Sequence, residues 1–227
     1  MSRKYKFRNP EGVYFVSFAT VNWIDVFTRA AYKDILVENL NYCVENKGLK
    51  IWAWAIMSNH LHLLISSETN NCSDILRDFK RVSSKAMLKA IEENPQESRR
   101  EWMLWMFERA GKKNSNNTKY QFWQQHNQPI EISKNTDKID KALNYIHENP
   151  IKAGFVDRAE NYPYSSAIDY AGEKGIVKIE MIYVNQLMNS ETQVTLPLNL
   201  HQRGTKPFTS RLETRSRGRR MSRQINN

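Results

Sequence analysis

The first half of the chain switches between a strand-like and a helix-like spacing of its apolar residues. Residues 13–20 (VYFVSFAT) alternate and favour β structure, so they predict a strand. Residues 30–46 have helical spacing, and Gly48 follows as a stop signal. Residues 50–57 and 60–66 predict two more strands, and the Ser-Asn pair between them predicts a hairpin. The apolar positions of the helix are Ile35, Leu36, Leu40 and Val44.

The second half predicts a long helix, an insertion and one further strand. Ser73 and Asp74 begin the helix, which runs to about Glu93. Residues 94–119 form an insertion with a helix over 101–110 and a loop after it. Residues 120–125 (YQFWQQ) predict a strand. The inward positions expected on the long helix are Ile75, Phe79, Val82, Ala86 and Ile91.

A last helix is expected from about Asn135 to His147. Its N-terminal cap is Asn135, or Thr136 together with Asp137. Pro150 disfavours helical geometry in the residue before it, so the helix is expected to end near Asn149.

The order strand, helix, strand, strand, helix, strand, helix defines the fold class. It predicts an α+β protein with the ferredoxin-like, split βαβ plan and an extra C-terminal helix. The sheet should be mostly antiparallel, with helices packed on one face. We expect one domain over residues 1–170, an extension over 171–202 and a flexible basic tail over 203–227.

Composition and charge narrow the class of protein. Hydrophobic residues make up 40% of the 227 residues, which is enough for a core. No apolar run approaches the roughly 20 residues that span a bilayer, and no apolar signal segment follows the N-terminal charges, so we expect a cytoplasmic protein. Cys43 and Cys72 do not form a metal-type cluster and are expected to be ordinary thiols. The net charge is +10, and the tail from Arg203 holds eight basic residues and one acidic residue, which suits contact with nucleic acid.

Two histidines interrupt the apolar strand MSNHLHLLI. Residues two apart on a strand point to the same face, so His60 and His62 project together while Leu61 and Leu63 face the helices. Neutral imidazoles are good ligands for transition metals. A histidine pair can also be two ordinary strand residues with hydrogen-bond partners. No third histidine has zinc-site spacing and neither cysteine is near, so a further ligand would come from another element.

The helix near the C-terminus of the domain carries the second dense motif, LNYIHENPIKAG. Ile139, Leu143 and Ile146 mark its buried stripe, whereas Tyr145 and Asn149, four apart, share a different face. The two side chains could therefore reach one site together, although a half-buried tyrosine and a terminal asparagine are common by themselves.

The two motifs together resemble the single-tyrosine HUH transposases over about residues 5–170. The closer resemblance is to the form associated with repetitive extragenic palindromes, because Tyr145-x-x-x-Asn149-Pro-x-Lys-x-Gly is followed by NYPYSSA at 161–167. The wider family comprises the transposases of the smallest insertion sequences. The resemblance implies that His60, His62 and Asn149 bind Mg²⁺ or Mn²⁺ and that Tyr145 is the nucleophile. It also implies single-stranded DNA with a hairpin as the partner and a 5′-phosphotyrosine intermediate.

Physical chemistry adds two expectations. Tyrosine has a pKa near 10 and needs activation, which a metal that polarises the phosphate can support. The proposed ligands are all neutral, so a hard cation should bind weakly until a DNA phosphate adds an anionic oxygen. Zinc could also occupy the histidines without being the working metal.

Basic residues predict where DNA lies. Cations beside aromatic residues suit unpaired bases and their phosphates, and the N-terminus interleaves both kinds of residue. A charged helix face can equally be solvated surface. The expected contacts are Arg3, Lys4, Lys6, Arg8, Lys80, Arg81, Lys85, Lys152, Arg215, Arg217, Arg219 and Arg220.

Several alternatives remain open at this stage. The main one is a non-catalytic nucleic-acid-binding regulator on the same fold, and another is a zinc hydrolase that uses the histidine pair. Tyr162 and Tyr164 are rival nucleophiles outside the helix, and Trp52 and Trp54 are expected in the core. Monomer and homodimer are both compatible with the sequence.

Overall fold

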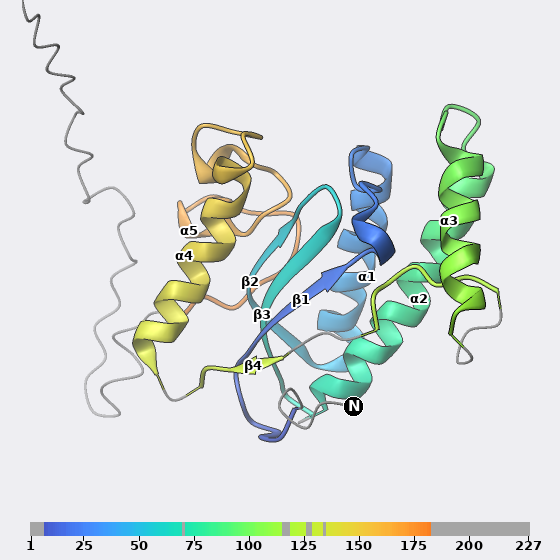
Figure 1. Ribbon diagram of the computed structural model, residues 1–227. Coiled ribbons are helices and arrows are strands. Elements are labelled where there is room, and N and C mark those ends of the chain that lie inside the picture. The colour runs from blue at the N-terminus through green and yellow to red at the C-terminus, as the bar shows by residue number, and fades with distance from the viewer. Residues whose placement is uncertain (1–6, 70, 115–118, 126–128, 134, 183–227) are drawn as a thin grey trace, which may run out of the picture.

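The computed structural model describes residues 7–69, 71–114, 119–125, 129–133 and 135–182, and these form a four-stranded antiparallel sheet with helices on both faces (Figure 1). The strands are β1 (Tyr14–Ala19), β2 (Leu49–Ile56), β3 (His60–Ser67) and β4 (Ile130–Glu131), in the spatial order β2-β3-β1-β4. Every pairing is antiparallel, and β3 lies between β2 and β1. The predicted α+β class and the β2–β3 hairpin are confirmed.

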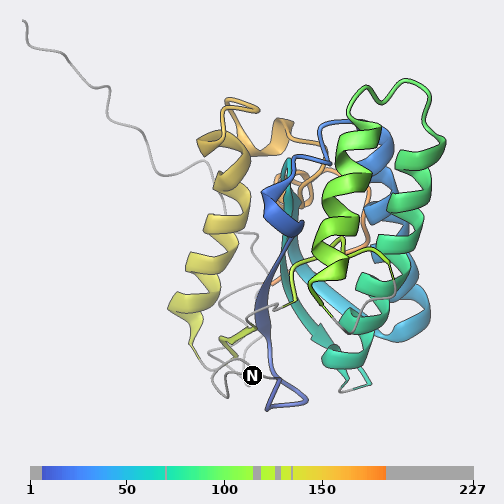
Figure 2. The same ribbon diagram turned by 45° about the vertical axis from the view of Figure 1, so that its right-hand side comes forward.

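The helices form two unequal layers. Figure 2 shows the sheet nearly edge-on, with α1, α2 and α3 on one side and α4 on the other. The helices are α1 (Ala30–Lys47), α2 (Cys72–Glu93), α3 (Arg100–Lys112), α4 (Thr136–Lys152) and α5 (Ala167–Tyr170), with short 3-10 turns η1 (Val21–Trp23) and η2 (Ala159–Asn161). Among the described residues, α4 is the long helix that crosses the second face, and Tyr170 of α5 and Ile182 pack beside it.

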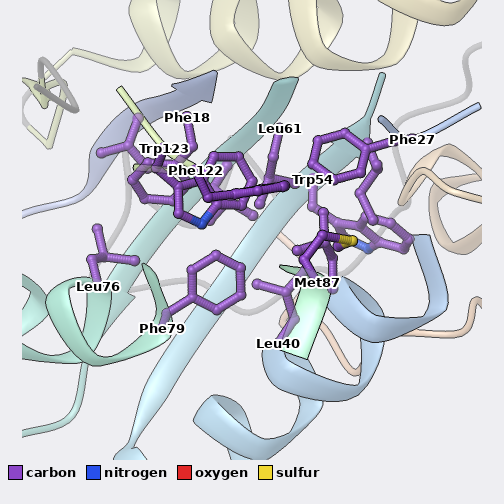
Figure 3. Close-up of a cluster of buried hydrophobic side chains, with 14 of the residues drawn as sticks. Phe18, Phe27, Leu40, Trp54, Leu61, Leu76, Phe79, Met87, Phe122 and Trp123 are labelled. Atoms are coloured by element: carbon purple, nitrogen blue, oxygen red, sulfur yellow. The ribbon is translucent and has the colours of Figure 1, made fainter. Parts of the chain in front are cut away.

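The alternation of side chains along β3 decides which groups enter which layer. Leu61, Leu63 and Ile65 join the core under α1–α3, as expected for the two leucines, whereas Leu64 joins the core under α4. Figure 3 shows the larger core, in which Trp54 and Phe79 lie among aromatic and aliphatic side chains. Trp54 is fully buried, so its predicted core position is confirmed.

Helix α4 docks closely because β2 offers it small residues. The stripe of Ile139, Leu143 and Ile146 packs in the same core as Ala53 and Ala55. Small side chains on a strand let the helix backbone approach, so the side chains of α4 that point along the sheet come near β3.

The helix ends follow local chemistry in most places. Gly48 ends α1 with a φ of 68°, a left-handed geometry that glycine adopts without a Cβ clash. Asn71 and Asn135 cap α2 and α4 by accepting bonds from the backbone N–H groups of Asp74 and Lys138. On α2 the prediction of an inward Val82 was wrong, because this side chain is 46% exposed and Ser83 is buried instead.

The predicted strand over 120–125 was wrong. Only a single bridge joins this segment to the sheet, between Trp123 and Thr20, and the fourth strand is Ile130–Glu131. Phe122 and Trp123 are adjacent and both buried in the larger core, which a strand with alternating faces does not allow. The segment crosses the end of β1 and fills the core with both rings (Figure 3).

The predicted end of α4 near Asn149 was also wrong. The helix continues through Pro150 to Lys152. Proline removes one backbone N–H from the ladder, but here it lies in the last turn, where few further bonds depend on it. Its ring is buried, so packing offsets the lost hydrogen bond.

The start of the expected extension is packed onto the domain. Val177 and Ile182 are buried, and the backbone N–H of Glu180 donates to the carbonyl of Ile51 at the outer edge of β2. Residues 183–202 and the basic tail over 203–227 lie outside the described residues.

Candidate active site

The two histidines lie side by side on the face of β3 that α4 crosses. Their ring centroids are 4.6 Å apart, with the ring planes 78° from parallel. Strand β3 is held on both sides, since His62 pairs with Ser17 of β1 and with Ala55 of β2. Ladder hydrogen bonds on both edges therefore fix the backbone positions of the two rings.

His62 is a buried imidazole. The residue is 5% exposed, and neither Nδ1 nor Nε2 has a hydrogen-bond partner among the described residues. Burial, and then the charge of His60, lower the pKa of His62 to about 3. The ring is therefore neutral at neutral pH, and an unsatisfied buried nitrogen of this kind fits a metal ligand.

His60 is oriented by a chain of polar groups from the β2–β3 turn and the segment after β1. Its Nδ1 lies 2.7 Å from Oδ1 of Asn59. The Asn59 Nδ2 donates to Oδ1 of Asp25 at 3.0 Å and to the carbonyl of Trp23 at 3.2 Å. Because both of those atoms only accept, Asn59 Oδ1 must face His60, and the proton of the neutral ring lies on Nδ1. The Nε2 lone pair is left for another ligand.

Removing the Asn59 side chain should change the tautomer of His60. With Asn59→Ala, the Nδ1–H loses its acceptor, so we expect the ring to shift toward the Nε2–H tautomer. The ¹⁵N chemical shifts of the ring nitrogens, measured at a pH above the pKa of free histidine, report this directly. Ser58→Ala is the matched control, because the Ser58 hydroxyl also donates to Asp25 Oδ1, at 2.6 Å, without contacting His60. An unchanged tautomer in Asn59→Ala would contradict the assignment.

Tyr145 lies opposite the histidines on α4. Its ring centroid is 5.2 Å from that of His62 and 5.9 Å from that of Phe15, and Phe15 stacks on His62 at 5.6 Å. The residue is 45% exposed, so its ring rests on the site while solvent and substrate can reach it. The structure thus brings together three of the four expected site residues from β3 and α4.

Asn149 lies one turn after Tyr145. Its Nδ2 donates to the backbone carbonyl of Tyr145 at 2.7 Å. This bond uses the amide nitrogen, so the Oδ1 atom, the donor that a metal would require, is not consumed by it.

His147 is a structural residue that no sequence pattern assigned. Its Nε2 lies 2.8 Å from the Ser166 hydroxyl, which also accepts from the backbone N–H of Trp54 at 3.0 Å. Burial lowers the pKa of His147 to about 4, so the ring remains neutral. This bridge ties α4 to β2 two residues after Tyr145. In the sequence, the NYPYSSA segment, which contains Ser166, was the feature that could have pointed to this bridge.

The hydroxyl groups of the two rival tyrosines form hydrogen bonds within the protein. The Tyr162 hydroxyl donates to the carbonyl of Ile56 at 2.7 Å, and the Tyr164 hydroxyl donates to Asp34 at 2.9 Å. Burial is the main cause that raises the pKa of each phenol to about 12. Neither group meets the histidine pair in a ring contact of the described residues.

The expected DNA contacts are scattered in the structure. Lys80 points inward, donates to the carbonyl of Gln124 at 2.6 Å and has its pKa lowered to about 8 by burial, which argues against a phosphate contact there. Arg81 is paired with Asp78 at 3.3 Å, Lys152 is paired with Glu148 at 2.8 Å, and Lys85 is exposed. Arg8 is also exposed. Outside the described residues lie Arg3, Lys4, Lys6, Arg215, Arg217, Arg219 and Arg220.

No group of three or more His, Cys, Asp and Glu side chains that could hold a metal occurs among the described residues. A zinc hydrolase with a complete protein ligand set therefore has no site in this part of the chain. A metal at the histidine pair would take its other ligands from amide, water or substrate oxygen.

The structure places a histidine pair on an antiparallel sheet opposite a tyrosine on a helix. The resemblance found in the sequence implied this arrangement. Residues 14–107 match the family model described as "Transposase IS200 like". The match contains His60 and His62 and ends before α4. It supports DNA transposition as the general activity.

A solved structure has the same fold. It is described as "Structure of the REP associates tyrosine transposase bound to a REP hairpin", with 18% identity, a TM-score of 0.52, and coverage of 79% of this chain and 90% of that one. No curated protein matches this chain. In the part of the chain that the structure describes, no helix is long and apolar enough to cross a membrane.

Proposed function

We propose that this protein is a metal-dependent enzyme that cleaves single-stranded DNA and transfers the strand through a 5′-phosphotyrosine on Tyr145. The observation that carries the proposal is the Tyr145 ring lying 5.2 Å from the ring of His62, whose two nitrogens are buried without a partner. The transposase family match supports the reaction class. Because the solved relative is described as bound to a REP hairpin, we extend hairpin-forming DNA to this chain as substrate.

The residues present suit a divalent cation. The Nε2 of His60 and a nitrogen of His62 would hold it, with Oδ1 of Asn149 as a third donor. Bound Mg²⁺ or Mn²⁺ would polarise and orient the scissile phosphate as a Lewis acid. These donors carry no charge, so the protein alone binds a hard cation weakly, and the DNA phosphate supplies the missing anionic oxygen.

The chain's own contribution is the position of the nucleophile. The Tyr145 oxygen attacks phosphorus, the bond from phosphorus to the 3′ oxygen breaks, and that oxygen takes up one proton while the phenol loses one. The 5′ end of one strand stays on the enzyme. A second 3′-hydroxyl then attacks the phosphotyrosine, which forms one phosphodiester and returns Tyr145 to the free phenol. Each step exchanges one phosphodiester for another, so no nucleoside triphosphate is consumed.

The test is a search for the covalent intermediate. The protein is incubated with Mg²⁺ or Mn²⁺ and single-stranded DNA that forms a hairpin and carries a label on the 3′ side of the cleavage point. A labelled protein band that resists denaturant, and that EDTA prevents, is the expected result. DNA binding with no such band for any hairpin tested would favour the non-catalytic regulator.

A further inference from the structure

We infer that a groove between η1 and α3 binds unpaired nucleotides next to the scissile phosphate. The inference rests on the proposed function for its substrate, single-stranded DNA. It concerns residues that lie outside the histidine and tyrosine site and that no sequence motif singled out.

The groove is large enough for a nucleotide. It has a volume of about 730 Å³, which falls within the roughly 300–1,000 Å³ of small-molecule sites. Its lining residues come mainly from η1 and α3, and these two elements lie near each other in Figure 2. The polar and aromatic lining residues include Asn22, Trp23, Arg109, Lys113, Gln124 and Gln125.

The charge of the groove suits a polyanion. Arg109 and Lys113 line it, and none of the described lining residues is acidic. Arg109 also lies over the ring of Trp105, 5.3 Å from its centroid. Cations beside exposed aromatic rings are the combination by which proteins bind single strands, since the cations neutralise phosphates and the rings stack on bases.

Trp23 has the features of a stacking platform. It is 56% exposed, although tryptophan is usually placed in a core. Asn22 and Trp23 both have left-handed backbones, with φ of 55° and 54°, which is unfavourable for a bulky residue. The turn is held by the Asn59 Nδ2, which donates to the Trp23 carbonyl at 3.2 Å. The protein thus holds an unfavourable backbone geometry that places an indole in solvent. Backbone strain of this kind is typical of binding sites.

Trp23 also connects the groove to the active site. Its ring is edge-on to the ring of His60, with centroids 5.8 Å apart. A strand whose base stacks on Trp23 in the groove would therefore lead its next phosphate toward the histidine pair. The amides of Asn22 and Gln125 offer donor and acceptor groups of the kind that recognise base edges, so the groove would favour particular bases.

The experiment compares two DNA probes on protein carrying Tyr145→Phe, so that cleavage does not interfere. One probe is a fluorescent hairpin with ten-nucleotide single-stranded flanks of mixed sequence, and the other is the same hairpin with blunt ends. Binding is measured by fluorescence anisotropy. We expect Trp23→Ala, and separately the double change Arg109→Ala with Lys113→Ala, to weaken binding of the flanked probe about tenfold or more. Binding of the blunt probe should not change.

Matched controls come from α3 and from α2, which packs against it. Trp102→Ala removes a 47% exposed tryptophan on α3 that does not line the groove, and Lys89→Ala removes an exposed cation on α2. Neither control should affect either probe. The Arg109 and Lys113 double variant does not touch the left-handed turn, so it keeps the test valid if Trp23→Ala alters the fold.

The outcomes separate this inference from the proposed function. Wild-type affinity of both groove variants for the flanked probe, or an equal loss for the two probes, would overturn the groove alone. The groove variants could lose affinity for the flanked probe alone while protein with Tyr145 intact forms no covalent adduct. That result would support the groove and overturn the proposed function. Failure to bind either probe would overturn both.

Discussion

Protein with Tyr145→Phe should form no covalent adduct with hairpin DNA, a loss of about 1,000-fold or more in cleavage, while its DNA binding stays unchanged. The reason is chemical, because phenylalanine lacks only the oxygen that would bond to phosphorus. The ring contacts of Tyr145 with His62 and Phe15 do not involve that oxygen and should persist. The measurement is the denaturant-resistant labelled band, together with anisotropy of the uncleaved DNA.

Tyr164→Phe is the matched control for this experiment. It also removes one phenolic oxygen, here one that donates to Asp34 away from the histidine pair, and it should form the adduct normally. An adduct that survives in Tyr145→Phe, or disappears in Tyr164→Phe, would move the nucleophile to another residue. The two variants together separate loss of the nucleophile from a general effect of losing a hydroxyl group.

Replacing His62 by phenylalanine should separate activity from stability. The new ring can still stack on Phe15, but both nitrogens are gone. Since neither nitrogen has a protein partner, removing them should raise the free energy of unfolding by about 1 kcal/mol or more, measured by urea denaturation. Calorimetry with Mn²⁺ and the DNA present should show metal affinity reduced by about 100-fold or more, and adduct formation should fall with it.

Calorimetry of the wild-type protein without DNA tests the weak-binding hypothesis. Wild-type protein without DNA should bind Mg²⁺ weakly, because the three donors are neutral, and tight binding by the free protein would refute that idea. A less stable His62→Phe protein would indicate that the nitrogens have partners and a structural role. A more stable and inactive variant would mark His62 as a residue kept for function at a cost in stability.

The geometry also explains why the site lies on this face of the sheet. Helices α1, α2 and α3 cover the other face, and the core between them and the strands is mostly hydrophobic. On the opposite face α4 is the one long helix of the described residues, so β3 can present two imidazoles beside it, and Tyr145 can be both packed and 45% exposed. The proposed reaction on a DNA backbone needs a site that a long chain can reach.

The sequence by itself determined the elements whose signal is local. The alternation in β3 assigned Leu61 and Leu63 to one face and His62 to the other, because the strand period is two wherever the backbone is extended. Gly48 marked the end of α1, since a left-handed residue is required there. The helical stripe of α4 and the common face of Tyr145 and Asn149 followed from the helical period in the same way.

Tertiary structure decided what depends on distant partners. Phe122 and Trp123 are residue types that favour strands. Both rings are nevertheless buried in the same core, under α1–α3, so the segment does not alternate between two faces as a strand does. Pro150 did not end α4, because packing held the last turn. Only the folded chain brings Asp25 to Asn59, Ser166 to His147, and Trp23 to the groove. The first two pairs are 34 and 19 positions apart in the sequence. Such contacts leave no periodic trace, because each is set by where two elements meet and not by the spacing within either one.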